Sequence, residues 1–287
     1  MLSYRHAFHA GNHADVLKHI ALVHLLGYMA QKEKPFWCID THAGAAIHDL
    51  DSRHAKTKSE FESGIARLWE RRDLPSPAAE YLRQVRALNP DGRLRFYPGS
   101  PQLAMQLLRK QDRLRLFELH STESRLLREH FADAISNSRP APRAIAQAGD
   151  GFTGLLALLP PPPRRGVVLI DPSYEDKADY RRVLTALREG LQRFASGVYV
   201  VWYPRVQRRE AFEFADKLKR ESPGDWLHAA LDVKAPAANG LGLHGSGIFV
   251  LNPPWTLAGA MREVLPYLVR LLEQDAKAGF SLEHQPA

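Results

Sequence analysis

The chain has 287 residues, 45% of them hydrophobic and 25% charged, so it can bury a full core in one large domain or two small ones. No apolar run is long enough to span a bilayer, and the N-terminal residues include no apolar region of the kind found in secretory signals. The single cysteine, Cys38, excludes an internal disulfide and is typical of a reducing compartment. We therefore expect a cytoplasmic protein with no membrane partner.

Positive charge dominates, with a formal net charge of +7 at pH 7, which suits a polyanionic partner. The basic residues gather in two regions of the sequence. The first region holds Arg93, Arg95, Arg109, Lys110, Arg113 and Arg115, and the second holds Arg205, Arg208 and Arg209.

The N-terminal segment SYRHAFHAGNHADVLKHIALVH is rich in histidine. We predict no metal site there, because the segment has no cysteine pair and no His-Glu-x-x-His pattern, and Gly11 interrupts the helical spacing of His9 and His13. Tyr4, Arg5 and His6 instead suit an arm, residues 1–15, that lies over an active site and contacts RNA. A packed N-terminal helix with polar caps is the alternative, and both can hold together.

Short apolar runs alternate with helical periodicity, which predicts an α/β fold with helices on both faces of a mostly parallel sheet. We expect helices over residues 179–194 and 208–220, the last two strands antiparallel, and a frayed tail after Asp275. The seven expected strands are 36–40, 114–119, 143–147, 167–171, 198–202, 227–233 and 247–251.

More chain separates the first two strands than doubly wound folds use between neighbours, so we expect an insertion. Two short stretches, one around Trp69 and one around Val85, each place their apolar residues on one helical face. They predict a small helical insertion over residues 47–90, inside a Rossmann-like domain made of residues 1–46 and 91–287. After the insertion, Ser100 is the expected N-cap of a helix, with Pro101 in its first turn.

The first strand runs into a small turn in the sequence FWCIDTHAGAA. Gly44 allows the backbone to approach a ligand closely, and one glycine where a dinucleotide fingerprint needs three argues against NAD. An acidic residue followed by such a turn is similar to the donor-binding loop of S-adenosylmethionine enzymes. An ordinary strand-to-helix turn is the alternative.

Acidic residues also end the next three strands. Glu118 stands where a carboxylate usually holds ribose hydroxyls, Asp150 where one usually receives an adenine amine, and Asp171 ends the fourth strand in VLIDPSY. Ligands of open α/β sheets bind at the carboxyl ends of the strands. A solvated carboxylate is the alternative interpretation of each position taken alone. Together with Asp40 at the end of the first strand, however, four successive strands end on an acidic residue, and this favours a binding site.

Asp/Asn-Pro-Pro-aromatic at such an end is typical of enzymes that methylate an exocyclic amine of a nucleobase. That nitrogen is a poor nucleophile because its lone pair is delocalised into the ring. The Asp171 carboxylate and the Pro172 carbonyl can each accept one of its N–H groups and stabilise the positive charge that grows during transfer. Tyr174 can stack on the extruded base. The plain alternative is a turn that ends a buried strand.

The last expected strand is followed by Asn252-Pro-Pro-Trp255, a literal match to the same pattern. The donor binds at the first strand, and the fourth strand lies beside the first in the usual arrangement, whereas the seventh lies toward the edge. We therefore assign the site to Asp171 and interpret Asn252 to Trp255 as a structural turn.

With these motifs in place, the sequence resembles the bacterial 23S rRNA adenine-N6 methyltransferase J family over nearly its whole length. The resemblance rests on MLSYRHAFHAGNHADVLKH, DTHAGA, YPGSP, ELH, DGF, VLIDP, WYP and NPPW, in this order. It implies a class I Rossmann-like methyltransferase that uses S-adenosyl-L-methionine, needs no metal and acts as a monomer on 23S rRNA, either naked or in early assembly.

The resemblance also implies roles for individual residues. Asp171 would accept the amine hydrogens, and Tyr4 would contact the RNA substrate. The implied cofactor contacts are Lys18, His19, His42, Ser100, Glu118, Asp150, Gly151 and Asp171.

The chain departs from the family pattern at Ser173, where the family has a second proline. Because Pro172 and Tyr174 are retained, we expect a looser loop with function preserved. Two alternatives stay open: an RNA-binding protein on a methyltransferase fold that has lost catalysis, and a DNA adenine-N6 methyltransferase.

Overall fold

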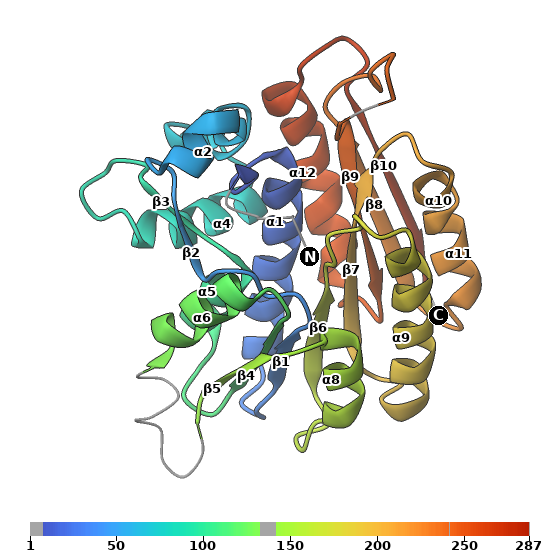
Figure 1. Cartoon of the computed structure of the whole chain (residues 1–287). Coiled ribbons are helices and arrows are strands. Elements are labelled where there is room, and N and C mark those ends of the chain that lie inside the picture. The colour runs from blue at the N-terminus through green and yellow to red at the C-terminus, as the bar shows by residue number, and fades with distance from the viewer. Residues whose placement is uncertain (1–7, 133–141, 241, 287) are drawn as a thin grey trace.

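The fold is built on one central sheet, which the computed structural model shows with helices on both faces (Figure 1). The structure describes residues 8–132, 142–240 and 242–286. The sheet strands are β1 (Trp37–Asp40), β4 (Arg113–Glu118), β5 (Ala144–Ala148), β6 (Gly166–Ile170), β7 (Val198–Arg205), β8 (Trp226–Asp232), β9 (Gly245–Leu251) and β10 (Gly279–Gln285).

The strand order is β10-β8-β9-β7-β6-β1-β4-β5. The five strands from β7 to β5 are mutually parallel, whereas β9 is antiparallel to both of its neighbours and β10 is antiparallel to β8. The expected placement of the fourth strand beside the first is confirmed, because β6 pairs with β1. The α/β class with a mostly parallel sheet is confirmed as well.

The central strands are apolar on both sides because both faces of the sheet are covered there. In β1, Cys38 belongs to one core and the next residue, Ile39, to the other. The same alternation places Leu169 and Ile170 of β6 on opposite faces. This burial explains why these runs read as nearly continuous apolar stretches in the sequence.

The helices around the sheet are α1 (His13–Ala30), α5 (Ser100–Leu107), α6 (Ser121–His130), α8 (Gly151–Leu158), α9 (Ala178–Arg193), α10 (Arg209–Phe212), α11 (Phe214–Glu221) and α12 (Thr256–Leu272). Helices α8, α9 and α11 cover one face, and α1, α5 and α12 the other. Within the described residues, every helix is too short or too polar to cross a bilayer.

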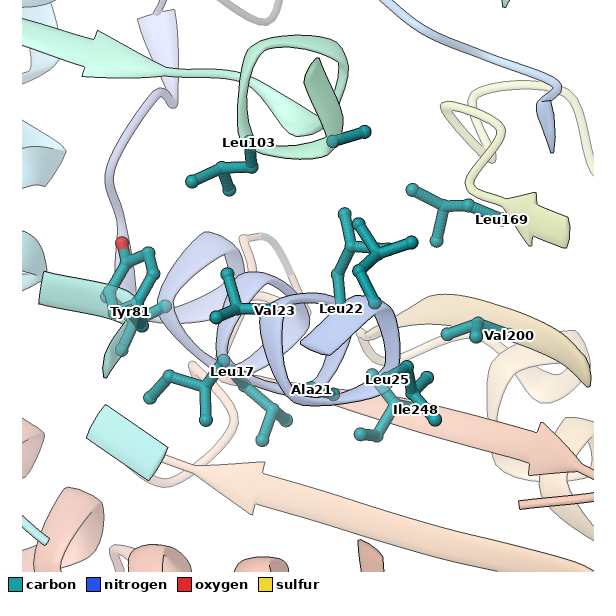
Figure 2. Packing of buried hydrophobic residues seen from close by; sticks show 14 of the residues in the cluster. Leu17, Ala21, Leu22, Val23, Leu25, Tyr81, Leu103, Leu169, Val200 and Ile248 are labelled. Atoms are coloured by element: carbon teal, nitrogen blue, oxygen red, sulfur yellow. The ribbon is translucent and has the colours of Figure 1, made fainter. Parts of the chain in front are cut away.

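Helix α1 is buried on nearly all sides. Asn12 caps it by accepting from the backbone amides of Ala14 and Asp15. Figure 2 shows Leu25 of α1 beside Ile248 of β9, while Leu103 belongs to α5 on another side of the helix. A helix enclosed in this way carries its few polar side chains into the interior.

Between β1 and β4 the chain forms α2 (Arg53–Lys58), the 3-10 turn η2 (Glu60–Ser63), α3 (Ile65–Trp69) and α4 (Ser76–Ala87). It also forms a two-stranded antiparallel sheet from β2 (Ile47–Asp49) and β3 (Phe96–Pro98). Helix α4 packs against α1 and α12, so these helices share the main core. The division of the chain at residues 46 and 90 stays a prediction.

Three expectations about the elements are wrong in detail. The main sheet has eight strands, not seven, because the tail expected to fray forms β10 and covers β8 along its length. Glu283 fixes this strand through Lys219, 2.8 Å away. The expected helix over 208–220 is split into α10 and α11. Helix α5 is capped by Gly99, because the Ser100 hydroxyl is bound elsewhere.

Part of the first basic region has a structural role. The Arg109 guanidinium donates to the carbonyls of Ala30 (2.8 Å) and Lys32 (2.7 Å) beyond the end of α1. It is also paired at 2.9 Å with Asp112, which is fully buried. These contacts lie at the amino ends of the strands, since Arg113 begins β4. Arg109 therefore joins α1 to the sheet on the side opposite Asp171.

Replacing Arg109 with alanine should lower the free energy of unfolding by about 2–3 kcal/mol, because Asp112 loses its charged partner and two carbonyls lose a donor. Urea unfolding measures this loss. The matched control is Lys110→Ala, an exposed neighbour with the same change of charge, which should cost less than about 0.5 kcal/mol. Equal losses in the two variants would contradict the structural role.

Candidate active site

The carboxyl ends of four neighbouring parallel strands form the site. Asp171 follows β6, Asp40 ends β1, Glu118 ends β4 and Asp150 follows β5, so the four predicted acidic ends lie along one edge of the sheet. The N-terminal half of α1 reaches the same edge and brings Lys18 to Asp171. This is the edge at which open α/β sheets bind ligands.

Lys18 is the charge at the centre of this edge. Its Nζ lies 2.7 Å from Oδ2 of Asp171 and 2.9 Å from Oδ1 of Asp15. Burial disfavours the ammonium, but the two carboxylates outweigh burial and raise the pKa of Lys18 above its usual value of 10.5. Lys18 therefore stays charged and fixes the orientation of the Asp171 carboxylate, whose side chain is 14% exposed.

Behind Lys18 lies a buried polar layer. Asp15 accepts from the backbone amide of Gly11 at 2.9 Å and from Lys18. The Nδ1 atom of His19 lies 2.7 Å from the hydroxyl of Tyr97. Because the His19 ring is only 1% exposed and sits behind Lys18, this arrangement does not support its predicted direct contact with a cofactor. His19 instead supports the layer that holds Asp15.

Asp40 is almost fully buried at the end of β1. Its Oδ2 accepts from the Ser100 hydroxyl at 2.6 Å, and its Oδ1 accepts from the backbone amide of His42 at 3.2 Å. Burial raises the pKa of Asp40 to about 6, although these two hydrogen bonds favour the ionised form. Ser100 thus holds the Asp40 side chain, which in turn binds the His42 amide in the predicted donor loop.

Glu118 holds the glycine turn in place. Its Oε2 accepts from the amide of Gly44 at 2.8 Å, and its Oε1 accepts from the amide of His120 at 2.6 Å. Gly44 has a φ of +62°, which favours glycine, and a Cβ placed there would meet no atom of the described residues within 4 Å. The turn around Gly44 is therefore both fixed and open on its outer side.

The start of α8 packs tightly against the same loop. A Cβ on Gly151 would lie 1.8 Å from the carbonyl oxygen of Thr41, so only glycine fits there. The His42 ring packs edge-on against Phe152 at 4.8 Å, and burial lowers the pKa of His42 to about 4, which keeps the ring neutral. Asp150 caps α8 through Thr153.

A hollow of about 660 Å³ opens beside Asp150, a volume typical of small-ligand sites. Its lining residues come from β4, β5, α6 and α8. They are Phe117, Arg128, Gln147, Ala148, Gly149, Asp150, Thr153 and Gly154.

Tyr174 does not lie where the sequence predicted it. Its ring is 2% exposed and packs against Tyr180 at 4.6 Å and Phe214 at 5.9 Å, and its hydroxyl donates to the Trp202 carbonyl at 2.7 Å. Stacking on a base would require the ring to leave this cluster, so in the present arrangement Tyr174 is a core residue. Pro172 is buried beside it, at the start of the loop.

Asn252 lies at the opposite edge of the sheet from Asp171, because β9 runs antiparallel to β7. Its side-chain amide donates to the carbonyls of Ala195 and Gly197, at the turn that precedes β7. The interpretation as a structural turn agrees with this geometry. The expectation that this strand lies toward the edge of the sheet is wrong, since β9 is an interior strand, and its antiparallel direction is what separates Asn252 from the site.

Tyr4, Arg5 and His6, the predicted RNA contacts, lie outside the described residues. In the part of the chain that is described, no cluster of three or more His, Cys, Asp or Glu side chains could hold a metal ion. Sequence reasoning missed Asp15, although its spacing from Lys18 and His19 places all three on neighbouring turns of one helix face.

The strand order, the glycine turn after β1 and the acidic strand ends define the class as a Rossmann-like methyltransferase fold. Comparison with known proteins gives the family. The family model described as "Ribosomal RNA large subunit methyltransferase D, RlmJ" matches residues 33–284. The chain belongs to this family.

Two curated relatives carry the name "Ribosomal RNA large subunit methyltransferase J". The Escherichia coli protein is 45% identical over 268 residues, which cover 93% of this chain and 93% of the relative. The Haemophilus influenzae protein is 43% identical over 284 residues, which cover 99% and 98%. A crystal structure of protein LPL1258 from Legionella pneumophila matches with a TM-score of 0.85 and 35% identity, over 96% of this chain and 98% of that one.

The buried Asp40 gives stability a predicted pH dependence. Its pKa of about 6 exceeds the 3.8 of an exposed carboxyl, so the folded state binds this proton more tightly, and the resulting stability is lost as the pH rises through 6. The Asp40→Asn variant has no carboxyl at this position, so its stability does not fall over this pH range for that reason. The difference in unfolding free energy, variant minus wild type, should therefore rise by up to about 3 kcal/mol between about pH 4 and about pH 7.5. A difference that does not change with pH in urea unfolding would contradict the assignment.

The core position of Tyr174 can be tested with two variants. Tyr174→Phe removes only the hydroxyl bound to Trp202 and should cost about 1 kcal/mol. Tyr174→Ala also removes the packed ring and should cost about 3–5 kcal/mol. Urea unfolding of both proteins gives the comparison, and an alanine variant as stable as wild type would show that the ring lies outside the core.

Proposed function

We propose that the protein transfers a methyl group from S-adenosyl-L-methionine to N6 of a single adenine in 23S ribosomal RNA. The family places the chain among proteins described as ribosomal RNA large subunit methyltransferases. The observation that carries the finer proposal is the Asp171 carboxylate, held by a buried lysine at the edge of the sheet and followed by Pro172. Action as a cytoplasmic monomer stays a prediction.

The residues beside Asp171 fit such a donor. The open glycine turn, the close approach of Gly151 to Thr41 and the hollow beside Asp150 would line the donor's path along the strand ends. Asp150 would receive the adenine end, Glu118 and the Gly44 turn would lie at the ribose, and Asp40 would lie beside the end nearer Asp171. When bound, the donor supplies an electrophilic methyl group on a positively charged sulfur.

The chain's own part in the reaction is to prepare the attacking nitrogen. The Asp171 carboxylate would accept one N–H of the adenine amine, and the Pro172 carbonyl would accept the other. These acceptors favour a pyramidal nitrogen and stabilise the positive charge that develops on it. Lys18 holds the carboxylate in place through Oδ2, so little reorganisation is needed when the base arrives. The looser loop expected from Ser173 stays a prediction.

The test is methyl transfer from labelled donor to unmodified 23S rRNA. Asp171→Asn keeps the shape of the side chain but removes the charge, and it should lower the rate at least about 100-fold while the protein stays folded. Asp216→Asn, an exposed carboxylate on α11, is the control and should keep full activity. A fully active Asp171→Asn variant would refute the role of Asp171.

The position of the label separates this function from its alternatives. Mapping should find one N6-methyladenine in the RNA, and DNA of equal sequence should accept no label. No transfer by the wild type would favour an RNA-binding protein that has lost catalysis.

A further inference from the structure

The loop after Asp171 is held in a conformation that a non-glycine residue rarely adopts. Tyr174 has a φ of +54°, in the left-handed region. Such a conformation costs free energy and persists only where surrounding contacts hold it. The ring contacts and the hydroxyl bond to Trp202 hold the side chain, while the Asp179 carboxylate accepts from the backbone amide and a further contact holds the backbone carbonyl.

The contact with the carbonyl comes from Arg208. Its Nη1 donates to the carbonyl of Tyr174 at 3.0 Å. Arg208 directly precedes α10, beyond the carboxyl end of β7, and β7 is the strand next to β6. The segment after β7 thus contacts the loop after β6 and holds it in place. Glu210 of this segment forms a second link to the loop, because it lies 3.7 Å from Lys177.

Arg208 also differs from the other arginines of its stretch. Arg205 is paired with Asp232 at 2.6 Å and Arg209 with Glu213 at 2.6 Å. Among the residues that the structure describes, no carboxylate forms an ion pair with Arg208, and its side chain is exposed. A guanidinium has five N–H donors in a planar fork that matches a phosphate, and a phosphate is a stronger acceptor for it than a neutral carbonyl.

We propose that Arg208 is a positioning residue that exchanges the Tyr174 carbonyl for a backbone phosphate of the RNA, and that this exchange releases the loop when the substrate binds. The inference rests on the proposed function, because it takes RNA as the substrate at this edge. It accounts for a motif tyrosine that is buried in the free protein although the motif suits contact with a base. Binding energy from a phosphate outside the reacting centre would thereby be used to rearrange the site.

Equilibrium binding of unmodified 23S rRNA over a series of KCl concentrations tests the phosphate contact. Arg208→Ala should weaken binding about tenfold and reduce the slope of log K against log [KCl] by about 0.7–0.9. Arg208→Lys keeps the charge and should keep the slope. Arg188→Ala, which removes an exposed arginine paired with Glu221 near the amino ends of the strands, is the matched control and should behave as wild type.

Hydrogen exchange in the RNA-free protein tests the hold on the loop. The amides of residues 173–177 should exchange faster in Arg208→Ala than in wild type or Arg188→Ala. An unchanged salt slope would overturn the phosphate contact, and unchanged exchange would overturn the hold on the loop. Methyl transfer by the wild type is measured on the same RNA. An active wild type with an unaffected Arg208→Ala variant refutes this inference alone, whereas an inactive wild type refutes the proposed function.

Discussion

The site depends on a buried ammonium held between two carboxylates. Lys18 and Asp15 come from α1, and Asp171 follows β6, so one charge cluster joins the first helix to the middle of the sheet. A lone charge in this position would be strongly disfavoured, and each member is tolerated only because the others are present. The charge cluster therefore fixes both the position of α1 and the orientation of the Asp171 carboxylate. Apolar packing around α1 (Figure 2) and the Arg109 contacts at its far end support the same placement.

Four carboxylates along one sheet edge would repel one another, and the fold deals with each in a different way. Asp171 has Lys18, Glu118 has two backbone amides, and Asp150 lies at the start of α8. Asp40 has a hydroxyl and an amide but, among the described residues, no cation in direct contact, and burial raises its pKa. The edge remains acidic overall, which suits the positively charged sulfur of the proposed donor.

The fold class and the row of acidic strand ends could be predicted because they depend on local patterns. Apolar runs that end on a carboxylate are visible in the sequence, and a parallel sheet brings such ends together. β10 could not be predicted in this way, since an edge strand with one solvated face, as in GFSLEHQ, lacks the apolar run of a central strand. The contact between Lys18 and Asp171 joins residues 153 positions apart, and only the family resemblance brought the two together beforehand. The burial of Tyr174 depends on Tyr180, Trp202 and Phe214, which belong to three later segments of the chain.

Tyr174 is buried in the core, whereas the sequence motif predicts that its ring contacts a base. An aromatic side chain beside an apolar cluster is stabilised by burial, and the cluster accepts it even though the backbone must adopt a left-handed conformation. A tyrosine that only packed in the core would cost less free energy at a position with ordinary dihedral angles, such as that of Tyr180 in α9. The strained position, three residues after Asp171, supports the proposal that the loop has a second arrangement. A ligand that selects the second arrangement would act on the loop from outside the cluster, and the Arg208 guanidinium is an exposed group that contacts the Tyr174 carbonyl.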